Sequence, residues 1–381
     1  MSEGNRFRFL ICGYHGFGNI GDESILHSLL RKIREKFDES DPEIVVLSNK
    51  PQETQKQHNV SAFNRWNPFI ILRELYRADI FISGGGGLLQ DTTSNHSLWY
   101  YWFSLLGALL TRTPFFILGQ GIGPIKNRVN KAITGFLLRK ARFSLVRDVD
   151  SVDFLQEQGI SQDKIIRGLD LALIDTLTEK ARDRIFSTED HPRIGVALKD
   201  LNPDREQILN TVASSLDALA EENELRSVLF STHPSHDLPM IKELEEKMEE
   251  KPTILDTDHL SGQELVDFIS DLNLVVAGRL HALIFALLAR TPCIAICYDR
   301  KMENLVEEFA NAENSPELKS WDPPELYQAD LFFEDLLYVS SSGSKIRKQL
   351  EISVPPVQKR AEKKLDKALE RIHNFLTNER G

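Results

Sequence analysis

The sequence predicts an α/β protein made of two doubly wound, Rossmann-like domains that face each other across a cleft. Short apolar runs rich in valine and isoleucine alternate with helical patterns, which is typical of parallel sheets with helical crossovers. This rhythm occurs twice, and 381 residues are too many for one hydrophobic core. We therefore predict an N-terminal domain at residues 1–176, a boundary within residues 176–191, a C-terminal domain at residues 190–352, and a final helix at residues 355–378 that packs back.

Charge and composition argue against several classes of protein. The formal net charge is −11, and residues 1–175 hold 21 Lys and Arg against 19 Asp and Glu, so we expect no nucleic-acid binding. The three cysteines lie in apolar strand patterns and no carboxylate and histidine cluster has ligand spacing, so we expect buried thiols and no metal. The longest apolar stretch, residues 98–110, is too short to cross a bilayer of about 30 Å, and residues 1–8 show no signal segment. We therefore expect a cytoplasmic protein.

The first strand, residues 6–12, runs into a glycine-rich turn that opens a helix at about residues 22–37. Gly16, Gly18 and Gly21 have the G-x-G-x-x-G spacing in the context of a dinucleotide site. Such a site also needs an acidic residue after the second strand, and that strand ends in Ser-Asn-Lys at residues 48–50, which argues against NAD. We expect this loop to approach another polar ligand, and Asp22 either to cap the helix or to bind that ligand.

Two further glycine clusters follow predicted strands of the first half. Residues 84–87 follow the strand at 79–83, and residues 119–124 follow the strand at 114–118. Glycines cost conformational entropy and are kept where the backbone must approach something closely, so we expect them at the ligand edge of the sheet. The basic helix at residues 127–140 is either a solvated face or a contact with phosphate groups or an anionic membrane surface.

The second half repeats the strand and helix rhythm. Strands at residues 193–198 and 227–230 deliver Lys199 and His233 to the expected ligand edge, although for His233 a loop position without a role is the alternative. A capping box at residues 261–264 opens the helix before the next strand.

The clearest candidate site lies where an apolar strand ends at Gly278 and a helix begins at His281. The amides at a helix start favour an anion, Arg279 can bond a phosphate or carboxylate bidentately, and His281 can carry a proton near neutral pH. The next strand delivers Lys301 to the same edge. The alternative is that Arg279 pairs with a nearby carboxylate and His281 is a polar residue without chemistry.

Five motifs in order resemble the polysaccharide pyruvyl transferase family, across about residues 8–305, and are closest to the CsaB-type enzymes that modify cell-wall polymers. The motifs lie at residues 16–26, 84–89, 119–124, 147–148 and 277–282. The resemblance implies a GT-B-like fold and transfer of pyruvate from phosphoenolpyruvate to two hydroxyls of a sugar as a ketal, with release of phosphate. It also implies a role in cell-wall polysaccharide synthesis and S-layer anchoring, with a lipid-linked oligosaccharide at the inner membrane face as acceptor.

The resemblance assigns roles to particular residues, and phosphoenolpyruvate is a co-substrate, so we expect no cofactor. Its phosphate and carboxylate require several cations and a helix start, and His281 is the expected acid for the methylene carbon. Catalysis is assigned to Arg147, Arg279 and His281. The donor is expected at Arg147, Gly278, Arg279, Leu280, His281 and Lys301. Apart from the resemblance, our own hypothesis is that the glycine loops of the first domain receive the acceptor, at Gly18, Asn19, Asp22, Gly86 and Gln120.

Two other functions stay open at this point. A GT-B glycosyltransferase with a nucleotide-sugar donor would also place basic residues and a helix start on a diphosphate. A non-catalytic descendant would bind glycans or partner proteins without turnover. The sequence predicts neither the acceptor sugar nor the oligomeric state.

Overall fold

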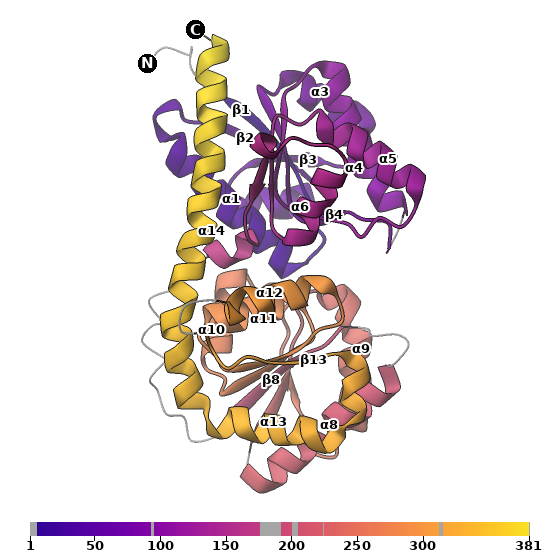
Figure 1. The fold of residues 1–381 in the computed structure, drawn as a ribbon, viewed down its shortest axis with the longest axis vertical. Helices are drawn as coiled ribbons and strands as arrows, with labels where there is room; N and C mark the ends of the chain where they lie inside the picture. The colour runs from indigo at the N-terminus through magenta and orange to yellow at the C-terminus, as the bar shows by residue number, and fades with distance from the viewer. Residues whose placement is uncertain are drawn as a thin grey trace. The chain divides into compact units, whose positions relative to one another are not determined.

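The computed structural model describes residues 6–92, 95–175, 192–199, 205–223, 225–311 and 315–380. The chain divides into two compact units: unit 1 comprises Met1–Ile174 and Lys359–Gly381, and unit 2 comprises Asp175–Gln358. The predicted boundary at residues 176–191 lies outside the described residues. Each unit holds a parallel sheet with helices around it (Figure 1).

Unit 1 contains a seven-stranded sheet with the order β3-β2-β1-β4-β5-β6-β7, and every neighbouring pair is parallel. Its strands are β1 (Arg8–Cys12), β2 (Glu43–Ser48), β3 (Ser61–Asn64), β4 (Ile80–Leu89), β5 (Phe115–Ile122), β6 (Ser144–Val146) and β7 (Ile165–Arg167). Its helices are α1 (Ile20–Lys36), α2 (Pro51–His58), α3 (Pro68–Arg77), α4 (Asn95–Thr111), α5 (Arg128–Arg139) and α6 (Val149–Glu157), with short 3-10 turns η1 (Asp38–Ser40), η2 (Gln162–Lys164) and η3 (Leu171–Ile174).

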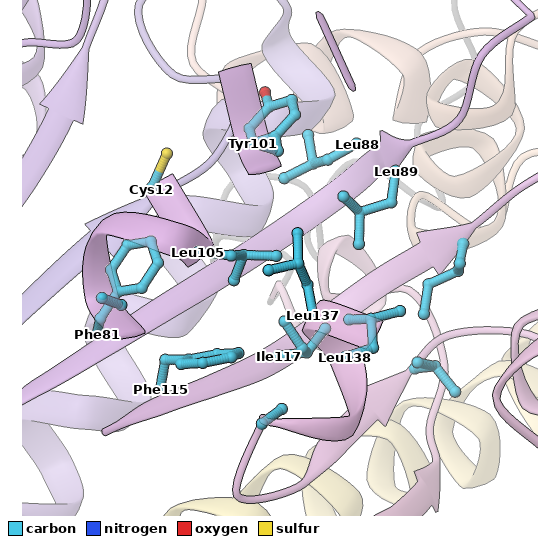
Figure 2. Close-up of a cluster of buried hydrophobic side chains, with 14 of the residues drawn as sticks. Cys12, Phe81, Leu88, Leu89, Tyr101, Leu105, Phe115, Ile117, Leu137 and Leu138 are labelled. Carbon is cyan, nitrogen blue, oxygen red and sulfur yellow. The ribbon is translucent and has the colours of Figure 1, made fainter. Parts of the chain in front are cut away.

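Both faces of this sheet are buried, which is why its strands are almost continuously apolar. On one face, Cys12 and Phe81 pack with Leu105 of α4 and Leu137 of α5 in a single buried cluster (Figure 2). On the other face, alternate strand residues meet aromatic rings near α1 and in the C-terminal helix. The ring centroids of Phe9 and Phe37 lie 4.9 Å apart, and those of Phe116 and Phe375 lie 5.7 Å apart.

The glycine clusters lie inside strands rather than after them, so that part of the prediction is wrong. Residues 84–87 belong to β4, and residues 119–121 belong to β5. The ladder between the two strands continues through Gly86, which pairs with Gln120, and its register shifts between Gly86 and Leu89. Gly85 and Gly86 have φ values of 77° and 71°, which favour glycine and accommodate the bulge, after which pairing resumes at Leu89.

Unit 2 contains a six-stranded parallel sheet with the order β10-β9-β8-β11-β12-β13. Its strands are β8 (Arg193–Ala197), β9 (Arg226–Leu229), β10 (Thr253–Ile254), β11 (Leu274–Ala277), β12 (Cys293–Ile296) and β13 (Lys319–Trp321). Its helices are α8 (Arg205–Asn223), α9 (Pro234–Lys247), α10 (Gly262–Ser270), α11 (Leu280–Leu288), α12 (Arg300–Ala310) and α13 (Ala329–Ser341), with the 3-10 turn η4 (Pro323–Tyr327). The predicted capping box before α10 is confirmed, since Ser261 and Glu264 bond reciprocally.

The final helix, α14 (Gly343–Arg380), is longer than the sequence predicts, and its start at residue 355 is corrected to Gly343. Two prolines, Pro355 and Pro356, suggested a start because proline lacks an N–H and usually interrupts a helix. Buried apolar residues nevertheless continue through them at helical spacing, namely Ile346, Leu350, Val354, Val357, Ala361 and Leu365. Tertiary packing of this stripe therefore outweighs the local preference.

Candidate functional site

Arg279 lies at the junction of β11 and α11, as the sequence predicts. It is the N-cap of α11, with extended backbone angles, and its carbonyl accepts from the amide of Leu283 at 3.0 Å. Gly278 has little room for a side chain, because an added Cβ would lie 3.1 Å from Leu198 Cδ2 and 3.3 Å from the Ala197 carbonyl oxygen. The tight packing of β11 against β8 therefore fixes where Arg279 leaves the sheet.

A buried carboxylate holds the Arg279 side chain. Asp237, in the first turn of α9, is fully buried and forms an ion pair with Nη2 of Arg279. Ser231 Oγ donates to Asp237 Oδ2 at 2.5 Å and accepts from the amide of His233 at 2.8 Å. The carboxylate pairing considered as an alternative for Arg279 is thus present.

Arg279 keeps bonding capacity beyond this ion pair. A guanidinium has five N–H donors, and the buried Nε of Arg279 has no hydrogen-bond partner within the described part of the chain. The side chain is 16% exposed, so it is not sealed inside the unit. Asp237 therefore orients Arg279 and leaves donors for an anion. Asp237 was not predicted from the sequence, although an acidic residue shortly after a proline is typical of the first turn of a helix.

The other basic residues predicted at this edge of unit 2 follow β11 itself or the strands next to it. His281 is half-buried in the first turn of α11, and its ring lies 6.4 Å from that of Phe285. Lys301 is half-buried at the start of α12, where Asp299 caps the helix and accepts from the Lys301 amide at 3.1 Å. Lys199, after β8, has its Nζ 4.2 Å from the ring centroid of Tyr298, after β12. The order β8-β11-β12 thus brings these groups to one edge.

Arg147 belongs to unit 1 and not to the unit that holds Arg279. It follows β6, is buried, and bonds Asp170 Oδ2 at 3.0 Å and Asp148 Oδ2 at 3.3 Å. Gly121 leaves space for it, since an added Cβ would lie 2.6 Å from Arg147 Nε. Asp170, which sequence analysis did not assign, therefore has the same supporting role for Arg147 as Asp237 has for Arg279.

The predicted acceptor residues gather at the start of α1 and on β4 and β5. Asn19, rather than Asp22, is the N-cap of α1, so the capping role considered for Asp22 is wrong. Asp22 instead packs against Gly86, where an added Cβ would lie 2.5 Å from Asp22 Oδ1. Gln120 is fully buried and donates to Ser83 Oγ at 2.8 Å, whereas Gly18 is exposed with open space around it. Their binding roles stay predictions.

A cationic and aromatic cluster lies at the same edge of unit 1, and sequence analysis missed it. Arg65 is 2% exposed, donates to the Gly13 carbonyl at 2.5 Å and to the Tyr101 hydroxyl at 3.2 Å. Its guanidinium lies 4.1 Å from the ring centroid of Tyr100 and 5.4 Å from that of Trp66. Trp66 is 57% exposed, so the cluster presents an aromatic surface. Residues so far apart in sequence gave no local signal.

A buried histidine lies beside this cluster. His15 is 2% exposed, and neither ring nitrogen has a hydrogen-bond partner within the described residues. Burial lowers the pKa of His15 to about 4, so the imidazole is neutral at pH 7. Glu23 accepts from the Gly16 amide at 2.7 Å and pairs with His58 Nε2 at 3.0 Å. Burial acts to raise the pKa of Glu23, but the hydrogen bonds from His58 and the Gly16 amide, together with the electrostatic effect of His15 and His58, outweigh it and the pKa is lowered.

Within the residues that the structure describes, no group of three or more His, Cys, Asp or Glu side chains could hold a metal ion. The thiols are buried, and burial raises the pKa of Cys293 to about 12, so it carries no thiolate at neutral pH. Over the same residues, no helix is long and apolar enough to span a membrane.

The two parallel sheets with their surrounding helices define a protein of the two-domain, Rossmann-like GT-B class. The fold is similar to that of S. aureus MnaA solved with UDP, with a TM-score of 0.65, 13% identity, and coverage of 98% of this chain and 97% of that one. It is also similar to UDP-GlcNAc 2-epimerase from Neisseria meningitidis bound to UDP-GlcNAc, with a TM-score of 0.64, 12% identity, and coverage of 96% and 99%.

The family follows from the sequence match. The model of the polysaccharide pyruvyl transferase family matches residues 19–300, and the chain belongs to this family. A relative is the amylovoran biosynthesis protein AmsJ of Erwinia amylovora, which is 21% identical over 82% of this chain and 88% of its own length. The protein is therefore a transferase of polysaccharide biosynthesis with a glycan acceptor.

Proposed function

We propose that the protein transfers pyruvate from phosphoenolpyruvate to two hydroxyls of one glycan sugar, forming a ketal and releasing inorganic phosphate. The observation that carries the proposal is Arg279, held by buried Asp237 at the start of α11, two residues before His281. A fixed guanidinium beside helix amides and a titratable imidazole suits a small dianionic donor. Membership of the pyruvyl transferase family supports the same reaction.

In this proposal Arg279 binds an anionic group of the donor, and the first amides of α11 and the ammonium of Lys301 add to its binding. Gly278 and Leu280 act through their backbone. Gly278 lets the end of β11 lie close to β8, and Leu280 is the first residue of α11. The role of Arg147 in donor binding and catalysis, expected from the family resemblance, stays a prediction because Arg147 belongs to the other unit.

His281 is the proposed general acid. It gives a proton to the methylene carbon of phosphoenolpyruvate, the C=C electron pair forms the new C–H bond, and positive charge develops at the adjacent carbon. One sugar hydroxyl attacks that carbon, and its proton returns to the neutral imidazole of His281, which restores the acid. A second hydroxyl then replaces the phosphate, so that one phosphoenolpyruvate and one diol give one ketal and one hydrogen phosphate. A positioned acid accelerates such a step by about 10²–10⁴-fold.

The acceptor site is proposed in unit 1, around Gly18, Asn19, Asp22, Gly86 and Gln120. The aromatic surface formed by Trp66 and Tyr100 extends this region, since sugar C–H faces pack well on aromatic rings. We further propose that the acceptor is a lipid-linked cell-wall oligosaccharide modified at the cytoplasmic side, as in CsaB-type enzymes that serve S-layer anchoring.

The test is phosphate release from phosphoenolpyruvate with a panel of amino-sugar diols. We expect acceptor-dependent release by the wild type, a loss of about 10²–10⁴-fold in His281→Ala, and a raised KM for phosphoenolpyruvate in Arg279→Lys. His259→Ala, at an exposed histidine of unit 2, is the matched control and should keep full activity. Activity of His281→Ala equal to that of the control would remove His281 from the mechanism.

A nucleotide-sugar glycosyltransferase is the second candidate, because the similar folds include proteins solved with UDP or UDP-GlcNAc. Turnover of a UDP-sugar, with no release of phosphate from phosphoenolpyruvate, would favour it over pyruvyl transfer. Binding of phosphoenolpyruvate without turnover on any acceptor would favour a non-catalytic role.

A further inference from the structure

Large apolar side chains are exposed on three helices of unit 1. Phe69 of α3 is 83% exposed, Leu110 of α4 is 72% exposed and Val129 of α5 is 64% exposed. Each belongs to a stripe at helical spacing, and we call the three stripes together the α3–α5 surface. Its members are Phe69 and Tyr76 on α3, Trp99, Phe103, Leu106 and Leu110 on α4, and Val129, Ile133 and Phe136 on α5.

The three helices pack side by side, so the stripes form one surface (Figure 1). Gly107 of α4 lets α3 come close, since an added Cβ would lie 2.8 Å from Leu75 Cδ1. Trp102 Nε1 of α4 donates to Thr134 Oγ1 of α5 at 3.0 Å. On each helix the buried residues lie on the opposite side and face the sheet, so the apolar stripes point outward.

The exposed charged residues within α3, α4 and α5 are all basic. The helix α4 carries no Asp, Glu, Lys or Arg, and the one acidic residue in α3, α4 and α5 is Glu74, which is fully buried. The exposed basic residues in and beside these helices are Arg73, Arg77, Arg112, Lys126, Arg128, Arg139 and Lys140. Two acidic groups lie beside α5: Asp91 accepts from the amides of Lys126 and Asn127, and Glu157 pairs with Lys131. This contrasts with the net charge of −11 for the whole chain.

We propose that the α3–α5 surface docks on the headgroup layer of a bilayer that contains anionic lipid. Aromatic and aliphatic side chains surrounded by Lys and Arg are the combination that partitions into the anionic interface. A second copy of the chain is the less suitable occupant, because a two-fold contact through this surface would set like charges opposite each other. The proposal does not depend on the pyruvyl transfer reaction.

The test is co-sedimentation of the full-length protein with vesicles of phosphatidylcholine alone or with phosphatidylglycerol. We expect binding to the anionic vesicles only, weakened by raising NaCl from about 0.1 to about 0.5 M because screening shortens the Debye length. Leu110→Ser with Val129→Ser should lower the partition coefficient about tenfold or more. Arg77→Gln with Arg128→Gln should lower it by a similar factor.

The matched control is Leu238→Ser with Ile352→Ser, which changes exposed aliphatic residues of unit 2 and should leave binding unchanged. Thermal unfolding of each variant checks that the fold is kept. Equal binding by the Leu110/Val129 variant and the control, equal binding to both vesicle types, or no binding by the wild type would overturn the proposal. So would a dimer in light scattering that only the Leu110/Val129 substitutions dissociate.

Discussion

Replacing Asp237 with asparagine tests whether the buried carboxylate holds Arg279 in position. The substitution keeps the shape of the side chain and removes its charge, so the Arg279 guanidinium loses its ion-pair partner. Asp237 is fully buried and Arg279 is 16% exposed, so water can replace little of the lost interaction. We expect lower stability of unit 2 and weaker binding of phosphoenolpyruvate.

The size of the effect follows from the burial of the pair. Removing one partner of a buried ion pair costs about 3–5 kcal/mol, and the partial exposure of Arg279 places the expectation near the lower end, about 3 kcal/mol. For a domain of the size of unit 2 this lowers Tm by about 6–12 °C. Loss of a hydrogen bond to a charged group, with its orienting effect, should raise KM for phosphoenolpyruvate about tenfold.

The control is Glu243→Gln on the same helix α9. Glu243 pairs with Arg205, but their side chains are 35% and 24% exposed. This pair should therefore contribute only about 0–1 kcal/mol to the free energy of unfolding. Differential scanning calorimetry and phosphate-release kinetics on both variants give the comparison. A Tm and a KM for Asp237→Asn that match those of Glu243→Gln would refute the orienting role of Asp237.

Two further predictions concern unit 1. The pKa of His15 is lowered to about 4 in the folded state, so the unfolded chain binds a proton more readily than the folded protein does. The free energy of unfolding therefore keeps its full value above about pH 6.5 and falls by about 3 kcal/mol at most as the pH drops toward 4. His15→Gln should abolish this loss in urea unfolding followed between pH 7 and 4, while His259→Gln should keep it. Gly85→Ala should lower the free energy of unfolding by about 2–5 kcal/mol. The left-handed backbone at Gly85 is strained by any Cβ, and that Cβ would collide with Ile25. Gly18→Ala, with a φ of 75° and open space, should cost only about 1–2 kcal/mol of strain, and equal losses of stability in the two variants would contradict the packing account.

The fold class could be predicted from the sequence because parallel strands that are buried on both faces appear as short, continuously apolar runs. The repeated strand and helix rhythm predicts a strand at residues 193–198, and β8 is Arg193–Ala197. The strand-to-helix junction at Arg279 could be predicted because a valine-rich run ends at Gly278 and an apolar helical pattern begins at His281. The two-domain fold and the family motifs were therefore available without coordinates.

Local rules failed where pairing or packing over long distances decides the structure. Residues 84–87 read as a loop, yet pairing with β5 keeps them in the sheet. Pro355 and Pro356 read as a helix start, yet a buried stripe carries α14 through both. In each case the backbone cost is local, whereas the compensating contacts come from residues far away in sequence.

The sequence by itself determined the two α/β units, the position of Arg279 and His281 at a strand end, and the family. Only the tertiary structure decided which residues support them. Asp237 lies 42 positions from Arg279, and Arg65 meets Tyr100 across 35 positions, so neither pairing leaves a periodic trace. The exposed face of α3, α4 and α5 was likewise hidden, because an apolar residue in a sequence does not reveal whether another element covers it.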